Sequence, residues 1–255
     1  MKKIVLALWF LVLAVGCDQK IEIQPNYDFT LTTVDSVQIF GDEYMTSSDA
    51  PTIILFHQGG SNARGEYGSI IPRLVDEGFN VITVDQRRGG QTYGSYNRTV
   101  ENIEINEYSY CDAYEDLTST LDYVISNESL TGEVIVWGSS YSASLAIQLA
   151  AKNQDKISGA LAFSPASGGP MASCKPDEYL EVLELPLLVL RPTGEMEIES
   201  VQRQFELVES FGHQTYVADP GVHGSSMLVQ SRTGAEAGES WNTVLEFINS
   251  ILNEQ

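Results

Sequence analysis

Residues 134–146 read VIVWGSSYSASLA, and they indicate the fold class more strongly than any other segment of this 255-residue chain. The first four are a continuous apolar run, which is typical of a strand buried on both faces of a sheet. The alanine-rich residues from 143 onward begin a segment with helical periodicity. The small residues between them indicate a sharp turn from strand to helix, with Ser140 at its centre.

The same alternation of strand and helix extends in both directions from this turn. Further apolar runs occupy residues 52–56, 80–84, 159–163, 187–190 and 215–217, and helical periodicity marks residues 66–77, 112–127, 141–153, 198–211 and 239–253. Alternating strands and helices predict a mostly parallel central sheet flanked by helices. Residues 20–23 and 36–40 alternate apolar with polar and predict antiparallel strands at the N-terminal edge. Catalytic residues are expected where the parallel strands end.

The turn at residues 138–142, GSSYS, resembles the nucleophile elbow G-x-S-x-G of the α/β-hydrolase family. Such a turn needs small residues two positions before and after the nucleophile. Gly138 meets this demand, and Ser142 stands where the family usually has glycine. If Ser139 were the centre, the flanking residues would be bulky, so Ser140 is the predicted nucleophile. The resemblance covers about residues 50–255, extends to dienelactone-hydrolase-like enzymes, and implies the α/β-hydrolase fold.

A serine hydroxyl needs a neighbouring base to become a good nucleophile. The chain has three histidines. His223 follows the last predicted strand and precedes the last helix, where the family places its catalytic histidine. His213 precedes that strand, at the opposite edge of the sheet, and is expected at the surface.

The family supplies its catalytic acid after the strand that ends here at Leu190. Residues 194–197, GEME, resemble the family's Gly-x-x-Asp turn, which makes Glu197 the predicted acid. Glu195, two residues earlier in the same loop, is the alternative.

Residues 57–61, HQGGS, resemble the His-Gly type of oxyanion loop in this fold. The backbone amides of Gly59 and Tyr141 are predicted to form the oxyanion hole, with Gln58 and Gly60 as alternatives to Gly59. His57 is then expected to hold the loop in place.

The N-terminus carries a targeting signal. Lys2 and Lys3 precede an apolar stretch at residues 4–15, and residues 13–17, LAVGC, resemble the lipobox of bacterial lipoproteins. This implies a signal peptide over residues 1–16, lipidation of Cys17, and a single α/β-hydrolase domain over residues 17–255. The protein would be exported and anchored by lipid to the cell envelope, on the periplasmic or surface side. A plain secretory signal with an incidental cysteine is the alternative.

Export would place Cys111 and Cys174 in an oxidising compartment, where a disulfide can persist. Two cysteines allow one pairing. Two possibilities remain open: a disulfide near the carboxyl ends of the strands, or two buried free thiols.

The net charge of −21 argues against nucleic acid as a partner, which requires clustered basic residues. No metal-binding constellation and no glycine-rich phosphate loop with a following lysine is present in the sequence, so no metal or cofactor is expected. Asp85 and Arg87, after the strand at 80–84, are expected to be structural.

The predicted site leaves room for a modest acyl substrate. Residues 164–179 are too few for a large lid, and the tyrosine-bearing stretch at 86–111 is expected to form the other wall. We therefore expect a serine hydrolase acting on a small carboxylic ester through an acyl-enzyme. A peptidase or amide hydrolase, and a non-catalytic lipid-anchored binding protein, are the alternatives. The sequence leaves the oligomeric state open.

Overall fold

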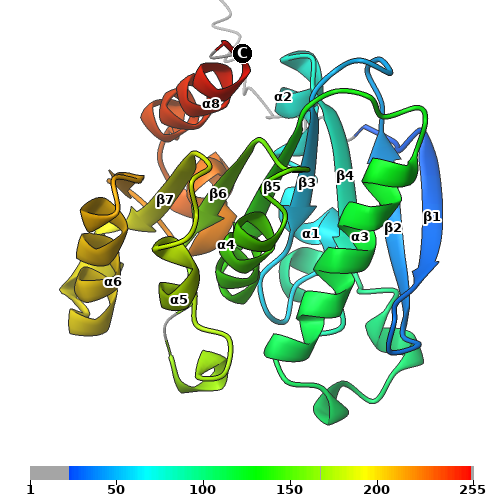
Figure 1. Cartoon of the computed structure of the whole chain (residues 1–255), viewed down its shortest axis with the longest axis horizontal. Coiled ribbons are helices and arrows are strands. Elements are labelled where there is room, and N and C mark those ends of the chain that lie inside the picture. Colours follow the sequence, from blue (N-terminus) through cyan, green and yellow to red (C-terminus); the bar gives the residue numbers. More distant parts are fainter. Residues whose placement is uncertain (1–22, 167, 254–255) are drawn as a thin grey trace, which may run out of the picture.

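The computed structural model describes residues 23–166 and 168–253. One sheet of eight strands forms the centre of the molecule, in the order β1-β2-β4-β3-β5-β6-β7-β8 (Figure 1). The strands are β1 Tyr27–Thr32, β2 Gln38–Tyr44, β3 Thr52–Phe56, β4 Asn80–Asp85, β5 Val134–Ser139, β6 Gly159–Phe163, β7 Leu187–Pro192 and β8 Gln214–Ala218. Strands β3 to β8 run parallel, whereas β2 is antiparallel to both β1 and β4. The predicted mostly parallel sheet with antiparallel strands at its N-terminal edge is thus confirmed.

Helices cover both faces of this sheet. The α-helices are α1 Ala63–Tyr67, α2 Ile71–Asp76, α3 Tyr114–Ser126, α4 Tyr141–Lys152, α5 Asp177–Leu180, α6 Glu199–Ser210, α7 Gln230–Thr233 and α8 Gly238–Asn253. The 3-10 helices are η1 Thr92–Gly94, η2 Val100–Asn102, η3 Ile105–Glu107, η4 Cys111–Ala113, η5 Gly169–Met171, η6 Thr193–Glu197 and η7 Gly224–Leu228. Apolar residues of α3, α4, α5 and α6 pack in one core on one face, and those of α1, α2 and α8 pack in a second core on the other.

The apolar runs of the sequence become strands because both of their faces are covered. Every residue of β3, β4, β5, β6 and β7 is buried. Trp137 of β5 and Phe163 of β6 stack with ring centroids 4.4 Å apart, which ties neighbouring strands within one core. Strand β8 forms the edge of the sheet and is only partly buried.

One expectation from the sequence pattern lies largely outside the described residues, and another was wrong in detail. Of the alternating residues 20–23 only Ile23 is described, outside any strand, and the first strand that the structure describes is Tyr27–Thr32. Its position follows from the tight turn before β2, where the amide of Thr33 donates to the carbonyl of Val37 at 2.9 Å and fixes the hairpin register. The helix predicted over residues 66–77 is divided into α1 and α2, because Pro72 is suited to the first turn of a helix and not to its interior.

The parallel strands bring their carboxyl ends to one edge, and the loops that follow β3, β5, β7 and β8 carry the predicted site residues there. None of the helices in the described part of the chain is long and apolar enough to cross a membrane. The predicted signal peptide and the lipidation site Cys17 lie outside the described residues.

Candidate active site

Ser140 lies at a strained turn between β5 and α4. Its φ of 62° and ψ of −120° place a non-glycine residue where few side chains are found, a feature that marks strained functional turns. The turn closes tightly, since a Cβ added at Gly138 would lie 2.3 Å from the carbonyl oxygen of Ser142. The sequence prediction of a glycine-dependent sharp turn therefore agrees with the geometry.

Ser142, which departs from the family's glycine, is bonded into this turn. Its buried hydroxyl accepts the amide hydrogen of Ser139 at 3.0 Å. The single hydroxyl proton can be donated to the carbonyl of Phe56 at 2.6 Å, with the carbonyls of His57 and Ser139 also in reach at 2.9 Å. The serine thus joins the elbow to the end of β3, where the oxyanion loop begins.

Ser139, the alternative nucleophile, is fully buried, and its hydroxyl is already hydrogen-bonded. Its hydroxyl accepts the amide hydrogen of Ser225 at 3.0 Å. In the same way the hydroxyl of Ser164, after β6, accepts the amide of Gly224 at 3.0 Å. These two bonds hold the loop that carries His223, and no sequence motif indicates this role for either serine.

His223 contacts Glu195 and not Glu197. Its Nδ1 lies 2.5 Å from Oε1 of Glu195, whose other oxygen accepts a hydrogen bond from Arg191 at 2.8 Å. The side chain of Glu197 is exposed and makes no hydrogen bond within the described residues. Both glutamates lie in η6, where the side chain of Glu195 meets Arg191, four residues earlier in β7, and that of Glu197 is exposed. The sequence preference for Glu197 as the partner of His223 is therefore corrected to its alternative.

The charge on Glu195 is stabilised by its two partners. Burial by itself would raise the pKa of this carboxyl, but the hydrogen bonds from His223 and Arg191 outweigh burial and leave the pKa below its usual value. An ionised Glu195 accepts the Nδ1 proton of His223, so that Nε2 is the nitrogen left free to take up a proton.

The oxyanion loop offers one suitable amide among the three candidates. The amide of Gln58 donates to the carboxylate of Glu66 at 2.9 Å, and that of Gly60 donates to the carbonyl of Arg88 at 3.0 Å. The amide of Gly59 has no acceptor in the part of the chain that the structure describes. The amide of Tyr141, the first residue of α4, likewise lacks an acceptor among the described residues. Two free backbone donors thus remain beside Ser140, those of Gly59 and Tyr141.

His57 is a scaffold residue, as expected. Its ring is fully buried, Nδ1 contacts the carbonyl of Gln58 at 2.8 Å, and Nε2 accepts the backbone amide hydrogen of Gln86 at 2.9 Å. Because a backbone amide can only donate, the ring proton is on Nδ1 and both nitrogens are occupied.

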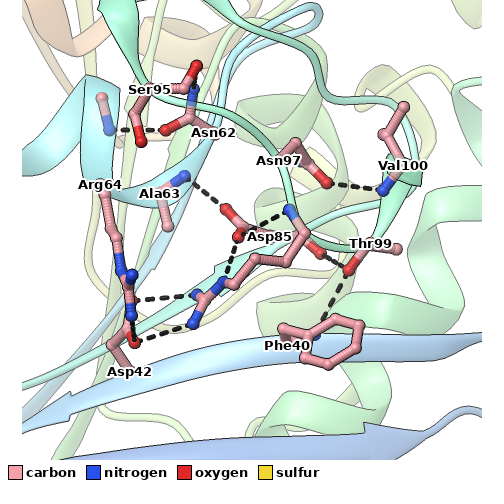
Figure 2. A network of polar contacts seen from close by, with 12 residues as sticks. Phe40, Asp42, Asn62, Ala63, Arg64, Asp85, Ser95, Asn97, Thr99 and Val100 are labelled. Atoms are coloured by element: carbon pink, nitrogen blue, oxygen red, sulfur yellow. Dashed lines mark hydrogen bonds and ion pairs between the residues drawn. The ribbon is translucent and has the colours of Figure 1, made fainter. Parts of the chain in front are cut away.

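Asp85 and Arg87 also belong to buried ion pairs beneath the site. Asp85 accepts the amide hydrogen of Ala63 at 2.8 Å (Figure 2). Asp85 also pairs with Arg98 at 2.6 Å, and Arg98 pairs in turn with Asp42. Arg87 bonds to Asp116 at 2.8 Å and to Asp35. These pairs hold the loop after β4 in place and do not contact Ser140 or His223.

Ser140 and His223 open into one cavity of about 280 Å³. Its other lining residues are Gln58, Gly59, Tyr110, Tyr141, Ala166, Gly168, Pro170 and Met171. The segment after β6 and the tyrosine-bearing stretch form its walls as expected, although Tyr110 is the only lining residue from residues 86–111.

A disulfide joins these two walls. Cys111, next to Tyr110, is bonded to Cys174, and their Cα atoms are 5.7 Å apart. Of the two open possibilities for these cysteines, the structure has the bridge. No group of three or more His, Cys, Asp or Glu side chains that could hold a metal ion occurs among residues 23–166 and 168–253.

Comparisons with known proteins agree on the fold. A family model described as serine aminopeptidase, S33, matches residues 48–242. No curated protein matches the sequence. An esterase from Pyrococcus furiosus superposes with a TM-score of 0.65 at 22% identity, covering 88% of this chain and 90% of the esterase. Brefeldin A esterase, a bacterial homologue of human hormone-sensitive lipase, gives a TM-score of 0.66 at 17% identity, covering 90% of this chain and 77% of the esterase. An acylaminoacyl peptidase from Pyrococcus horikoshii gives 0.63 at 14% identity, covering 91% of this chain and 42% of the peptidase.

Proposed function

The chain belongs to the serine aminopeptidase S33 family of hydrolases and has the α/β-hydrolase fold, and we propose that it cleaves small carboxylic esters through an acyl-enzyme. The observation that carries this proposal is the cavity shared by Ser140 and His223, with His223 bonded to Glu195 behind it. These are the three groups that a serine hydrolase requires: nucleophile, base and orienting acid.

The geometry supports the following mechanism. Ser140 Oγ attacks the acyl carbonyl while Nε2 of His223 takes the hydroxyl proton. The amides of Gly59 and Tyr141 bind the oxygen that becomes negative, and each such donor typically contributes about 2.7–4 kcal/mol to transition-state stabilisation. His223 then protonates the leaving alkoxide, and a water molecule, activated by the same histidine, releases the acid and regenerates Ser140.

The dimensions and chemistry of the cavity support a short, uncharged acyl group. Its volume of about 280 Å³ lies just below the range of about 300–1,000 Å³ usual for drug-sized ligands. Tyr110, Pro170 and Met171 provide apolar surface. We propose a short-chain ester on this basis.

An aminopeptidase is the second candidate, because the family is described by that activity. An enzyme of this kind must hold a protonated amino group, and a buried cation requires an anionic or hydrogen-bonding partner. No carboxylate lines the cavity within the described part of the chain, so only neutral groups such as Gln58 and Tyr110 would be available to that cation. The ester is therefore the better-supported substrate class.

A panel of p-nitrophenyl esters from acetate to octanoate, set beside aminoacyl p-nitroanilides, tests this proposal. We expect the highest kcat/KM with the short esters, complete loss in Ser140→Ala, and no change in Ser129→Ala, which alters an exposed loop serine. Anilides cleaved at least as fast as esters would establish the peptidase. Folded protein that hydrolyses neither class and resists a fluorophosphonate probe would favour the binding protein instead.

We also propose that the enzyme is anchored to the cell envelope through lipid on Cys17. The lipobox-like residues 13–17 support this, and so does the Cys111–Cys174 disulfide, a bond typical of exported proteins. Cys17→Ser should abolish incorporation of labelled palmitate and release the protein from membranes. Cys111→Ser is the control, and equal incorporation in both variants would refute lipidation at Cys17.

A further inference from the structure

Arg191 is a buried cation at the carboxyl end of β7, close to the candidate active site. Its side chain is only 3% exposed, and it contacts three separate parts of the fold. One guanidinium nitrogen donates to Glu195 in η6 at 2.8 Å, and the other donates to the carbonyl of Pro165 after β6 and to the side chain of Gln204 in α6. The guanidinium is therefore fixed by η6, by the segment after β6 and by α6.

The carboxylate of Glu195 is shared between this cation and the histidine. Oε2 accepts from Arg191, and Oε1 lies 2.5 Å from Nδ1 of His223. A carboxylate held at one oxygen by a planar, immobile donor presents its other oxygen in a defined direction. Arg191 thus determines where the acceptor for His223 lies.

We propose that Arg191 is a positioning residue, which fixes the carboxylate of Glu195 so that this residue, and not Glu197, orients His223. The inference rests on the proposed serine-hydrolase function. It also accounts for the position of the acid, since Glu195, four residues after Arg191, meets both the buried guanidinium and the imidazole.

The charges around the pair are few. Glu195 faces Arg191 and His223, and Glu195 is the one ionised partner of Arg191 among the described residues. Without the guanidinium, burial still raises the pKa of Glu195, and His223 is the only one of its two partners left to lower it. Because Glu195 must be ionised to orient His223, the acidic limb of the activity profile should move to higher pH.

The test compares Arg191→Met and Arg191→Lys with a matched control, Arg203→Met. Arg203 also pairs with a glutamate four residues away, Glu199, but both side chains are exposed, at 64% and 84%. We expect Arg191→Met to lower kcat for a p-nitrophenyl ester on the order of 10²-fold, the cost of a misplaced catalytic group, with KM within about twofold. Arg191→Lys should recover part of this loss, and its acidic limb should lie between those of the wild type and Arg191→Met. Arg203→Met should behave as the wild type.

A double-mutant cycle with Glu195→Gln separates positioning from folding. If Arg191 acts through Glu195, adding Arg191→Met or Arg191→Lys to Glu195→Gln should change kcat by less than about threefold. An additive loss in that background, or an unshifted pH limb in Arg191→Lys, would overturn the inference. If Arg191→Met does not fold, as circular dichroism would reveal, Arg191→Lys alone completes the cycle. Ester hydrolysis that persists in Ser140→Ala would instead reject the underlying function.

Discussion

Restoring the family's glycine at position 142 should destabilise this protein. The hydroxyl of Ser142 accepts the buried amide hydrogen of Ser139 at 3.0 Å and donates toward the carbonyl of Phe56 at 2.6 Å. Both Ser142→Ala and Ser142→Gly remove this bridge between the elbow and the end of β3. The carbonyl of Phe56 keeps a second donor, the hydroxyl of Tyr67 at 2.7 Å, so the principal cost falls on the amide of Ser139.

The size of the effect can be worked out from that amide. A buried donor left without an acceptor costs about 1–3 kcal/mol. Glycine within α4 adds about 0.5–1 kcal/mol relative to alanine, because it loses more conformational freedom on folding. For a domain of this size each kcal/mol lowers Tm by about 2–4 °C. We therefore expect a fall of about 4–8 °C in Ser142→Ala, for a cost near 2 kcal/mol, and a larger fall in Ser142→Gly.

Thermal unfolding by calorimetry measures this directly. Ser144→Ala is the matched control, since it removes a helix serine whose hydroxyl makes one bond, to the carbonyl of Ala166 at 2.9 Å. Loss of one ordinary hydrogen bond costs about 0.5–1.5 kcal/mol, so Ser144→Ala should melt above both Ser142 variants. A Ser142→Gly protein that melts at or above the wild-type temperature would refute the bridging role of this hydroxyl.

Three further predictions concern the acid, the cavity wall and pH. Glu195→Gln should lower kcat for a short ester by about 10⁴-fold, as loss of a triad carboxylate does elsewhere, while Glu197→Gln should match the wild type; the reverse order of the two rates would restore Glu197 as the acid. The double variant Cys111→Ser/Cys174→Ser should lose up to about 4 kcal/mol of stability, because the bridge closes a loop over a sequence separation of 63. Its KM for esters should also rise, since the two cavity walls are no longer joined; unchanged KM and urea midpoint would contradict both effects. The pKa of Glu195 is lowered on folding, so its contribution to stability is complete above the unfolded pKa and is lost as pH falls through the folded pKa. The difference in Tm between the wild type and Glu195→Gln should therefore shrink on acidification below about pH 4. A difference that grows would show that folding raises the pKa of Glu195.

Much of the fold could be predicted because buried parallel strands have a direct sequence signature. The runs at 52–56, 80–84 and 134–137 are apolar on both faces, and each is found in a strand that is wholly buried. The half-buried first strand has no such signature. The alternation at 20–23 and 36–40 did not indicate a strand at Tyr27–Thr32, whose register is fixed by the hairpin turn at Thr33–Val37, a contact that spacing does not reveal.

The turn motif pointed to the wrong glutamate as the partner of His223, although another feature of the sequence indicates the right one. The Gly-x-x-Asp resemblance counts residues from Gly194 and reaches Glu197, but counting says nothing about which carboxylate has a partner. Arg191 ends the apolar stretch LLVLRP at residues 187–192, and an arginine that closes a buried strand needs an anion or hydrogen-bond acceptors close by. Within one helical turn after it, only Glu195 can supply that anion. At this site the need of a buried arginine for a nearby anion therefore outweighs the turn motif.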